Sequence, residues 1–443
     1  MGMTAGEIAA ATPAARDRYV DFLRVASLAT VVLGHWLMAA VTTGADGGVE
    51  VGNLLAVRPA LQPLTWVLQI MPVFFFVGGF SHALSYRSVA RSGGGYAAFL
   101  RARLRRLLGP TMLFVAVWAA GALLLPVPDV AARLVAQPLW FIGIYLGMVA
   151  FTPPLLRLHE RYGWGAFAAL SAGAVVVDVL RFALDVPYVP FLNFAFVWLA
   201  VHQLGFLRAD GRLRLPAVPA VCGLAGAVAL VALGPYPLSM VGMPGERISN
   251  MAPPTLALLC HGVWLVGAVE LLRRPAARLL ARPRVWRGVV AANGIAMTAF
   301  LWHLTAMLAV YGALISLGRT LPAPATAAWW AQVPLRVAAA TALTAALVAV
   351  FRRAERPPAP RPAQAPGPLS GPGAAFGVAL ALLGVLGLSA VGFGGLLDGH
   401  SATLIAFRVT APAAVLMAVA GWALVERAGR VRAEPGVSPP GRP

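Results

Sequence analysis

Two residues in the first long apolar segment, Arg24 and His35, have side chains that could take part in chemistry. They stand eleven residues apart, and because an α-helix turns by about 100° per residue, they fall within about 20° of the same face. The rise of about 1.5 Å per residue separates them by about 16 Å along the helix axis. Asp21 precedes Arg24 by one turn on roughly the same face. The spacing therefore predicts a stripe of three ionisable groups.

The residue types in this stripe suggest acid–base chemistry on an anionic ligand. Imidazole is the usual general base for activating a hydroxyl near neutral pH, and guanidinium holds phosphate or carboxylate oxygens in a forked contact. One long ligand could touch both Arg24 and His35. The structural alternative is that Arg24 and Asp21 extend to the cytoplasmic interface while His35 hydrogen-bonds between helices.

The chain around this stripe has the composition of an integral membrane protein. Of its 443 residues, 59% are hydrophobic and 12% are charged, and the mean hydropathy is +0.78. Apolar runs such as Phe22–Val41 and Ala375–Leu397 have the length of a membrane-spanning helix, about 20 residues. A β-barrel would instead show segments of about ten residues with alternating polarity. The sequence therefore predicts an all-α, polytopic transmembrane bundle, in which ionisable residues face a protein interior or a wet cavity.

The charge distribution predicts how this bundle crosses the membrane. The net charge is +19, and all 35 basic residues are Arg. They cluster between apolar runs without the interleaved aromatic residues that stack on bases, so no nucleic-acid partner is expected. With the N-terminus in the cytoplasm, 28 Arg lie inside and 7 outside, in agreement with the positive-inside rule. We therefore expect a multi-pass protein of the cell membrane with both termini cytoplasmic.

Pro, Gly and charge clusters divide the chain into segments. Twelve spans are predicted near residues 20–41, 63–86, 107–125, 138–156, 164–184, 189–207, 216–234, 253–272, 293–317, 328–350, 374–396 and 403–425. Seven prolines within residues 352–373 predict an extended cytoplasmic linker. The expected organisation is a cytoplasmic tail at 1–17, a ten-helix core at 18–351, two additional helices at 374–426 and a disordered cytoplasmic tail at 427–443.

Several motifs in this chain resemble the acyltransferase 3 family of integral membrane acyltransferases. The family's Arg-x10-His pattern stands here as Arg24 to His35, preceded by Tyr19-x-Asp21, and Met71-Pro-Val-Phe-Phe-Phe-Val-Gly-Gly-Phe80 is similar to its helix-two segment. That segment is followed by Arg87 and an expected Arg-rich inner loop ending at Pro110. Weaker similarities are Trp140-Phe141, Pro153-Pro154 and Thr298-Ala-Phe-Leu-Trp-His303. Together these motifs cover roughly residues 18–350.

The resemblance implies a ten-helix core that passes an acyl group, often acetyl, from cytoplasmic acyl-CoA to a hydroxyl of an acceptor. It implies an essential role for His35 and a role for Arg24 in donor binding or site structure. Acceptors in the family include surface polysaccharides, peptidoglycan, lipids and macrolide-type metabolites, so the acceptor here is expected to be a glycan, lipid or secondary metabolite. Two departures are Gly78, where the family usually has Ser, and Phe300, where Tyr is frequent.

Further candidates surround this predicted site. Arg87 and Arg105 stand where acyl-CoA would approach, and Arg clusters bind phosphate well, although inner Arg are also topology signals. Asp21, Trp140 and His303 are expected to line the substrate pore, with a structural histidine as the alternative for His303. Histidines 82, 202 and 261 are expected to pack between helices, and Asp178 is spaced to pair with Arg181. No constellation of metal ligands stands out, so no metal is expected.

Three functions fit these features. Membrane O-acyl transfer would use His35 as the base toward the acceptor hydroxyl or as an acyl-transfer residue. A twelve-helix secondary transporter would use the same polar face for substrate or proton binding, although a late Pro-rich linker does not divide the chain into equal halves. A non-catalytic membrane scaffold is the third. The sequence motifs favour acyl transfer.

Overall fold

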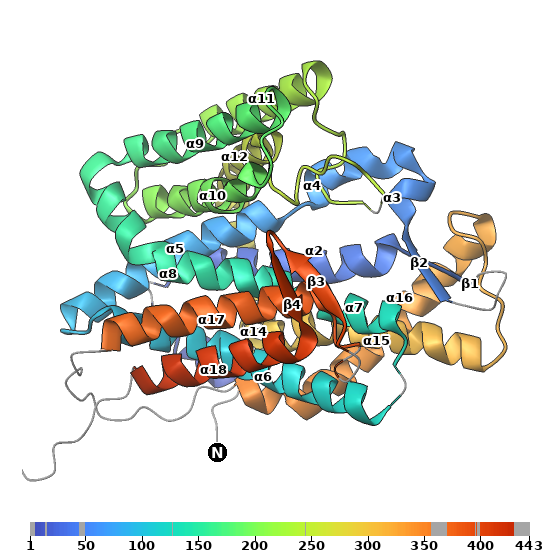
Figure 1. Cartoon of the computed structure of the whole chain (residues 1–443). Coiled ribbons are helices and arrows are strands. Elements are labelled where there is room, and N and C mark those ends of the chain that lie inside the picture. The colour runs from blue at the N-terminus through green and yellow to red at the C-terminus, as the bar shows by residue number, and fades with distance from the viewer. Residues whose placement is uncertain are drawn as a thin grey trace, which may run out of the picture.

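The computed structural model describes residues 5–13, 16–43, 49–125, 127–243, 245–355, 370–394, 396 and 399–428. Long helices run roughly side by side through the molecule (Figure 1). Helix α2 (Arg18–Met38) carries the predicted polar stripe and contacts α5 (Met71–Arg91), α14 (Pro283–Asn293) and α15 (Ala296–Ser316). The all-α polytopic bundle predicted from composition is confirmed.

The remaining long helices pack in pairs around this centre. The pairs with extensive contact are α5 with α10 (Asn193–Ala209), α11 (Ala217–Leu233) with α12 (Leu256–Leu271), α15 with α16 (Ala327–Phe351), and α17 (Ser370–Val391) with α18 (Ala411–Ala428). Helices α6 (Tyr96–Leu124), α8 (Pro138–Tyr162) and α9 (Trp164–Phe182) complete the bundle. Shorter helical elements are α1 (Ala5–Ala10), α3 (Leu54–Val57), η1 (Pro59–Leu64), α4 (Thr65–Leu68), α7 (Asp129–Ala136), η2 (Val189–Leu192), α13 (Arg273–Leu280) and η3 (Arg352–Glu355).

Ten helical segments of the described residues are long and apolar enough to cross a membrane. A further bent pair, α12 and α13, meets at 51°, and α11 is a shorter apolar helix of 17 residues. Each of the twelve predicted spans overlaps one of these helices. The count of twelve crossings and the cytoplasmic placement of both termini stay predictions.

Close backbone contacts hold some of these pairs together. A Cβ at Gly79 on α5 would overlap the carbonyl of His202 on α10, and one at Gly205 would overlap the carbonyl of Phe76. In the same way, a Cβ at Gly421 of α18 would overlap the backbone of Ala381 on α17. Glycines at such crossings let helices approach closely, which is a common source of helix association in membranes.

The beginning and end of α2 follow from its sequence. Asp17 caps the helix, because its carboxylate accepts hydrogen bonds from the amides of Tyr19 and Val20 at 3.1 and 3.2 Å. The helix ends at Met38, and the chain continues as strand β1 (Ala39–Thr43), which pairs antiparallel with β2 (Val49–Asn53). A second hairpin, β3 (Ser401–Leu404) with β4 (Phe407–Thr410), joins α17 to α18.

The structure corrects several local expectations. The Arg-rich inner loop is wrong: Arg101–Arg106 lies within helix α6, which also contains Pro110. Arginine is a good helix former and can extend its charged head to water, so a helix need not end where the apolar run does. The predicted second span breaks at Gln69 and Ile70, since α5 begins at Met71 with Pro72 in its first turn.

Parts of the predicted organisation lie outside the described residues. These are residues 1–4 and 14–15 of the N-terminal tail, 356–369 of the Pro-rich linker and 429–443 of the C-terminal tail. Within the described part of the N-terminal tail, α1 contacts α14. The two hairpins and the helices α13 and α14 were not among the predicted elements.

Candidate active site

The imidazole of His35 on α2 contacts that of His303 on α15. His35 Nδ1 and His303 Nε2 are 2.8 Å apart, and the two rings stack with their centroids at 5.1 Å. His303 is fully buried, whereas His35 is partly exposed. The neighbouring Trp36 donates its indole N–H to the carbonyl of His303 at 3.0 Å. Two hydrogen bonds therefore fix this part of α2 to α15.

The hydrogen bonds assign the proton on each ring. His303 Nδ1 lies 2.5 Å from the carbonyl of Phe300, and because a carbonyl can only accept, this nitrogen carries the proton. In a neutral His303 the Nε2 atom is then an acceptor, so the proton between the two rings belongs to His35 Nδ1. His35 Nε2 consequently keeps a free lone pair, and it has no hydrogen-bond partner among the described residues.

At the other end of α2, Arg24 is held by two neighbours. Its Nη2 donates to Ser81 Oγ on α5 at 2.9 Å, and its Nη1 lies 3.5 Å from Asp21 Oδ1. Asp21 is buried and also accepts from Arg16 Nε at 2.6 Å. Arg24 keeps 30% of its side chain exposed. Asp21, predicted to line the pore, thus holds two guanidinium groups in place.

Two residues of this cluster were missed by sequence reasoning. Ser81 follows Gly78 by three residues, so a hydroxyl is present on α5 one turn after the position where the family pattern has Ser. A Cβ at Gly78 would instead face Tyr145 at 3.5 Å. Asn293 on α14 donates to the carbonyl of Asp21 at 3.1 Å. The only sequence feature that could have identified Ser81 is its position three residues after Gly78, because residues i and i+3 share a face of a helix.

The two Arg residues predicted to bind the donor are paired with carboxylates. Arg87 Nη1 lies 2.5 Å from Asp210 Oδ1. Arg105 Nε lies 3.5 Å from a carboxylate oxygen of Glu426 on α18. Neither side chain contacts Arg24 in the described part of the chain. Burial raises the pKa of Asp210, but hydrogen bonds from Arg87 and His159 outweigh it and hold that pKa below its usual range.

Trp140 on α8 is connected to the histidine pair only through other rings. It meets Phe141 edge to face with centroids 6.5 Å apart, and Phe141 meets Phe300 in the same way at 4.9 Å. Phe300 precedes His303 by one turn and supplies the carbonyl bound to it. Phe300 in turn stacks on His303 at 5.7 Å, so three ring contacts connect Trp140 with His303. Among the described residues, Trp140 does not contact the imidazole of His303 or His35 directly.

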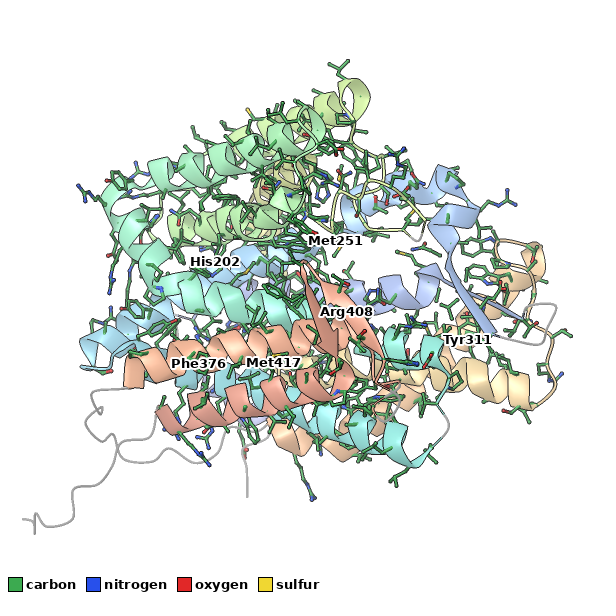
Figure 2. All side chains as sticks on the ribbon, viewed as in Figure 1. His202, Met251, Tyr311, Phe376, Arg408 and Met417 are labelled. Carbon is green, nitrogen blue, oxygen red and sulfur yellow. The ribbon has the colours of Figure 1, made fainter. Side chains whose placement is uncertain are left out.

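The other helix-packing histidines have identifiable partners. His82 Nδ1 lies 3.0 Å from His202 Nε2, and His82 Nε2 lies 2.9 Å from the hydroxyl of Tyr145. His202, labelled in Figure 2, comes from α10 in the interior of the bundle. His261 Nε2 contacts the carbonyl of Trp66 at 2.7 Å. The bundle thus contains a second buried histidine pair on helices other than α2.

The expected pairing of Asp178 with Arg181 is present only as a Coulombic attraction, since no ion pair or hydrogen bond joins the two side chains in the described part of the chain. Asp178 accepts hydrogen bonds from Asn193, from the hydroxyl of Tyr236 and from the backbone amide of Leu256, at 2.9, 3.0 and 2.7 Å. These donors satisfy the carboxylate from neighbouring segments. Asp178 therefore ties the ends of three helical segments together.

Comparison with known proteins was informative at the level of the family. Residues 17–353 match the family model described as an acyltransferase domain. The matched region contains Arg24, His35 and His303, whereas α17 and α18 follow it. No curated protein and no solved structure matches the chain.

Proposed function

We propose that this chain, which belongs to the acyltransferase 3 family and is a multi-pass membrane acyltransferase, transfers an acyl group from cytoplasmic acyl-CoA to a hydroxyl. In the simplest case the acyl group is acetyl. The hydroxyl belongs to a glycan, a lipid or a secondary metabolite. The observation that carries this proposal is the free Nε2 lone pair of His35, oriented by His303. A half-buried imidazole with an assigned acceptor nitrogen is suited to take a proton from a hydroxyl.

In the proposed reaction, His35 Nε2 removes the proton of the acceptor hydroxyl as its oxygen attacks the thioester carbonyl. The new C–O bond forms, the C–S bond breaks, and the proton passes from His35 to the departing CoA thiolate. His303 is a positioning residue, because it accepts from His35 Nδ1 at 2.8 Å and thereby keeps the lone pair on Nε2. Its acceptor nitrogen also stabilises the imidazolium that forms during transfer.

Arg24 would hold the anionic part of the donor. It retains exposed surface while Ser81 and Asp21 restrict its guanidinium, and a restricted guanidinium loses less conformational entropy on binding phosphate. Its place on the same helix as His35 gives a long donor two attachment points, about 16 Å apart along the axis. Arg87 and Arg105 are weaker candidates for donor contacts, since neither lies on α2 with His35 and each also pairs with a carboxylate.

The test uses purified protein in lipid nanodiscs with radiolabelled acetyl-CoA, together with mass spectrometry of glycans, lipids and metabolites from cells with and without the protein. We expect a lost acyl mass in cells without it, and His35→Ala and His35→Gln to abolish label transfer. His82→Gln is the matched control, because it alters the other buried histidine pair. Wild-type transfer by both His35 variants would overturn the mechanism. Uptake of an unmodified solute into proteoliposomes without acetyl-CoA turnover would overturn the function.

A further inference from the structure

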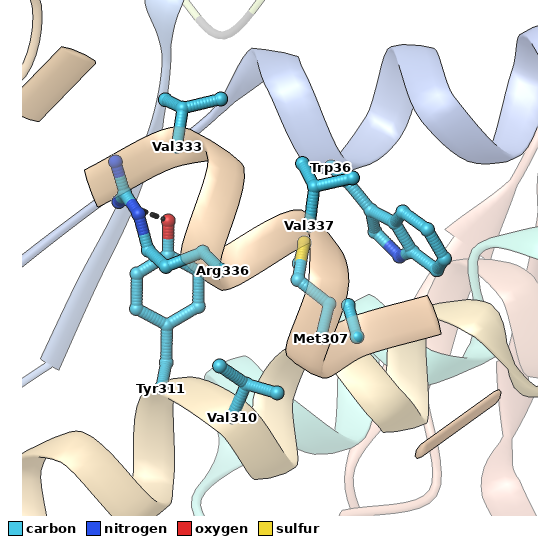
Figure 3. A pocket seen from close by; sticks show the side chains of 8 residues that line it. Trp36, Met307, Val310, Tyr311, Val333, Arg336 and Val337 are labelled. Carbon is cyan, nitrogen blue, oxygen red and sulfur yellow. Dashed lines mark hydrogen bonds between the residues drawn. The ribbon is translucent and has the colours of Figure 1, made fainter. Parts of the chain in front are cut away.

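A pocket next to the histidine pair is lined by one buried arginine side chain. It lies between α2, α15 and α16 (Figure 3), and its lining residues are Trp36, Met307, Val310, Tyr311, Val333, Arg336, Val337 and Ala340. Seven of these are apolar or aromatic. The exception is Arg336, whose side chain extends along the pocket toward the hydroxyl of Tyr311.

Arg336 has neutral partners only. Its Nη1 donates to the hydroxyl of Tyr311 at 2.7 Å and its Nη2 to the carbonyl of Trp329 at 2.8 Å. Its guanidinium lies over the rings of Trp329 and Tyr311, at 4.7 and 5.5 Å. The residue is 8% exposed, and its Nε–H is buried without an acceptor. No carboxylate of the described residues forms an ion pair with it.

This arrangement is costly without a ligand. A cation inside a membrane-spanning helix normally pairs with a carboxylate or faces water. A buried N–H without an acceptor loses its hydration and gains no hydrogen bond in exchange. The side of the guanidinium that carries Nε is the side that, together with one Nη, grips two oxygens of a carboxylate or phosphate. Arg336 therefore presents an incomplete oxyanion site whose remaining partner is an anion.

The pocket adjoins the proposed catalytic residues. Trp36 lines it and also donates to the carbonyl of His303. On α15, Met307 and Tyr311 follow His303 at intervals of four residues, so all three lie on one face of the helix. This face leads from His303 to the hydroxyl that binds Arg336, about 12 Å along the axis at the helical rise of about 1.5 Å per residue.

We propose that this pocket binds the acceptor, that the acceptor carries a carboxylate or phosphate group, and that Arg336 holds that group. The pocket itself is small, with room for the anionic group alone. The carbon skeleton therefore lies outside it, along the face of α15 that leads past Trp36, and the hydroxyl extends toward His35. This inference rests on the proposed acyl transfer and specifies its acceptor as an anionic hydroxyl compound. The same anion could come from a soluble glycan unit or from a lipid headgroup.

The experiment measures binding in the absence of acyl-CoA, so that it does not depend on transfer. Purified protein in neutral detergent is titrated with radiolabelled methyl glucuronide, glycerol 1-phosphate and the neutral methyl glucoside, and native mass spectrometry compares phosphatidylglycerol with phosphatidylcholine. We expect at least one anionic probe to bind at least tenfold more tightly than its neutral counterpart. Arg336→Gln should remove this preference and Arg336→Lys should retain part of it. Arg319→Gln, which removes an exposed Arg, should bind like the wild type.

Each outcome decides the inference. Selective binding of the glucuronide assigns a soluble glycan unit, and selective binding of phosphatidylglycerol assigns a lipid. Equal binding of anionic and neutral probes, or an unchanged preference in Arg336→Gln, would overturn the proposal. If Arg336→Gln does not fold, Tyr311→Phe serves instead, since it removes one hydrogen bond to Arg336 and should weaken anion binding severalfold. Absence of acyl transfer in a wild type that binds anions would refute the proposed function and leave the anion site standing.

Discussion

Replacing His303 by Leu tests how the two histidines divide their roles. The substitution removes the acceptor of the His35 Nδ1 proton, a contact of 2.8 Å, while leaving His35 itself in place. His35 can then carry its proton on either nitrogen, and the imidazolium formed during transfer loses its partner. A hydrogen bond to a charged group contributes about 1.5–3 kcal/mol, which corresponds to about a 10- to 150-fold decrease in kcat.

The same change also affects folding, so a matched variant is needed. His202→Leu removes the partner of His82 Nδ1 in the second buried pair, where the nitrogens are 3.0 Å apart. Each variant leaves one ring nitrogen without its partner, and each should lower the free energy of unfolding by about 1–3 kcal/mol. Only His303→Leu should slow transfer. His303→Gln should recover part of the activity, because its amide oxygen can accept from His35.

The assay is label transfer from acetyl-CoA at saturating donor, with thermal unfolding measured on the same samples. A folded His303→Leu protein with wild-type kcat would refute the assigned protonation states. Equal losses of activity in His303→Leu and His202→Leu would show that the effect arises from stability alone.

Three further predictions follow from contacts elsewhere in the bundle. Gly79→Ala should lower thermal stability by about 1–3 kcal/mol, because its Cβ overlaps the α10 backbone, whereas Gly121→Ala has open space and should unfold like the wild type. Glu426→Gln should release Arg105 and strengthen acetyl-CoA binding up to about fivefold at low salt; equilibrium dialysis showing weaker or unchanged binding would contradict a donor role for Arg105. The pKa of Asp210 is lowered on folding, so its stabilisation is present above the unfolded value of about 3.9 and is lost as the pH falls through the folded pKa. Unfolding curves against pH should show less acid destabilisation for Asp210→Asn, and identical curves would contradict this.

The sequence was most informative within single helices. The phase of Arg24 and His35 on α2 is a local property, fixed by helical geometry. Their partners are not local, since Ser81 lies 57 residues from Arg24 and His303 lies 268 residues from His35. Only tertiary packing determines which helix faces α2 at each height, and His303 was named because of the family motif rather than by spacing.

Charge patterns predict which side of the membrane each segment faces, but they do not determine local structure. The basic residues of Arg101–Arg106 are typical of an inner loop between spans, whereas in the structure they continue helix α6. The pairing of Arg105 with Glu426 could not be predicted, because Glu426 belongs to a helix beyond the matched region. The burial of Arg336 beside Tyr311 depends on how α15 and α16 pack, so it could not be predicted from the sequence.

The packing of α17 and α18 against the core has a consequence for how the protein is made. A Cβ at Gly143 on α8 would lie 2.6 Å from Leu386 of α17, so this face of α8 is shaped for a helix rather than for lipid. The ribosome completes that partner only after all the residues that match the family model. During synthesis the face of α8 around Gly143 must therefore be covered temporarily by lipid or an insertion factor. We expect two fragments, expressed as separate chains that end and begin within residues 356–369, to reassemble in one membrane. The smaller fragment contains α17 and α18, which already contact each other closely before they pack on α8.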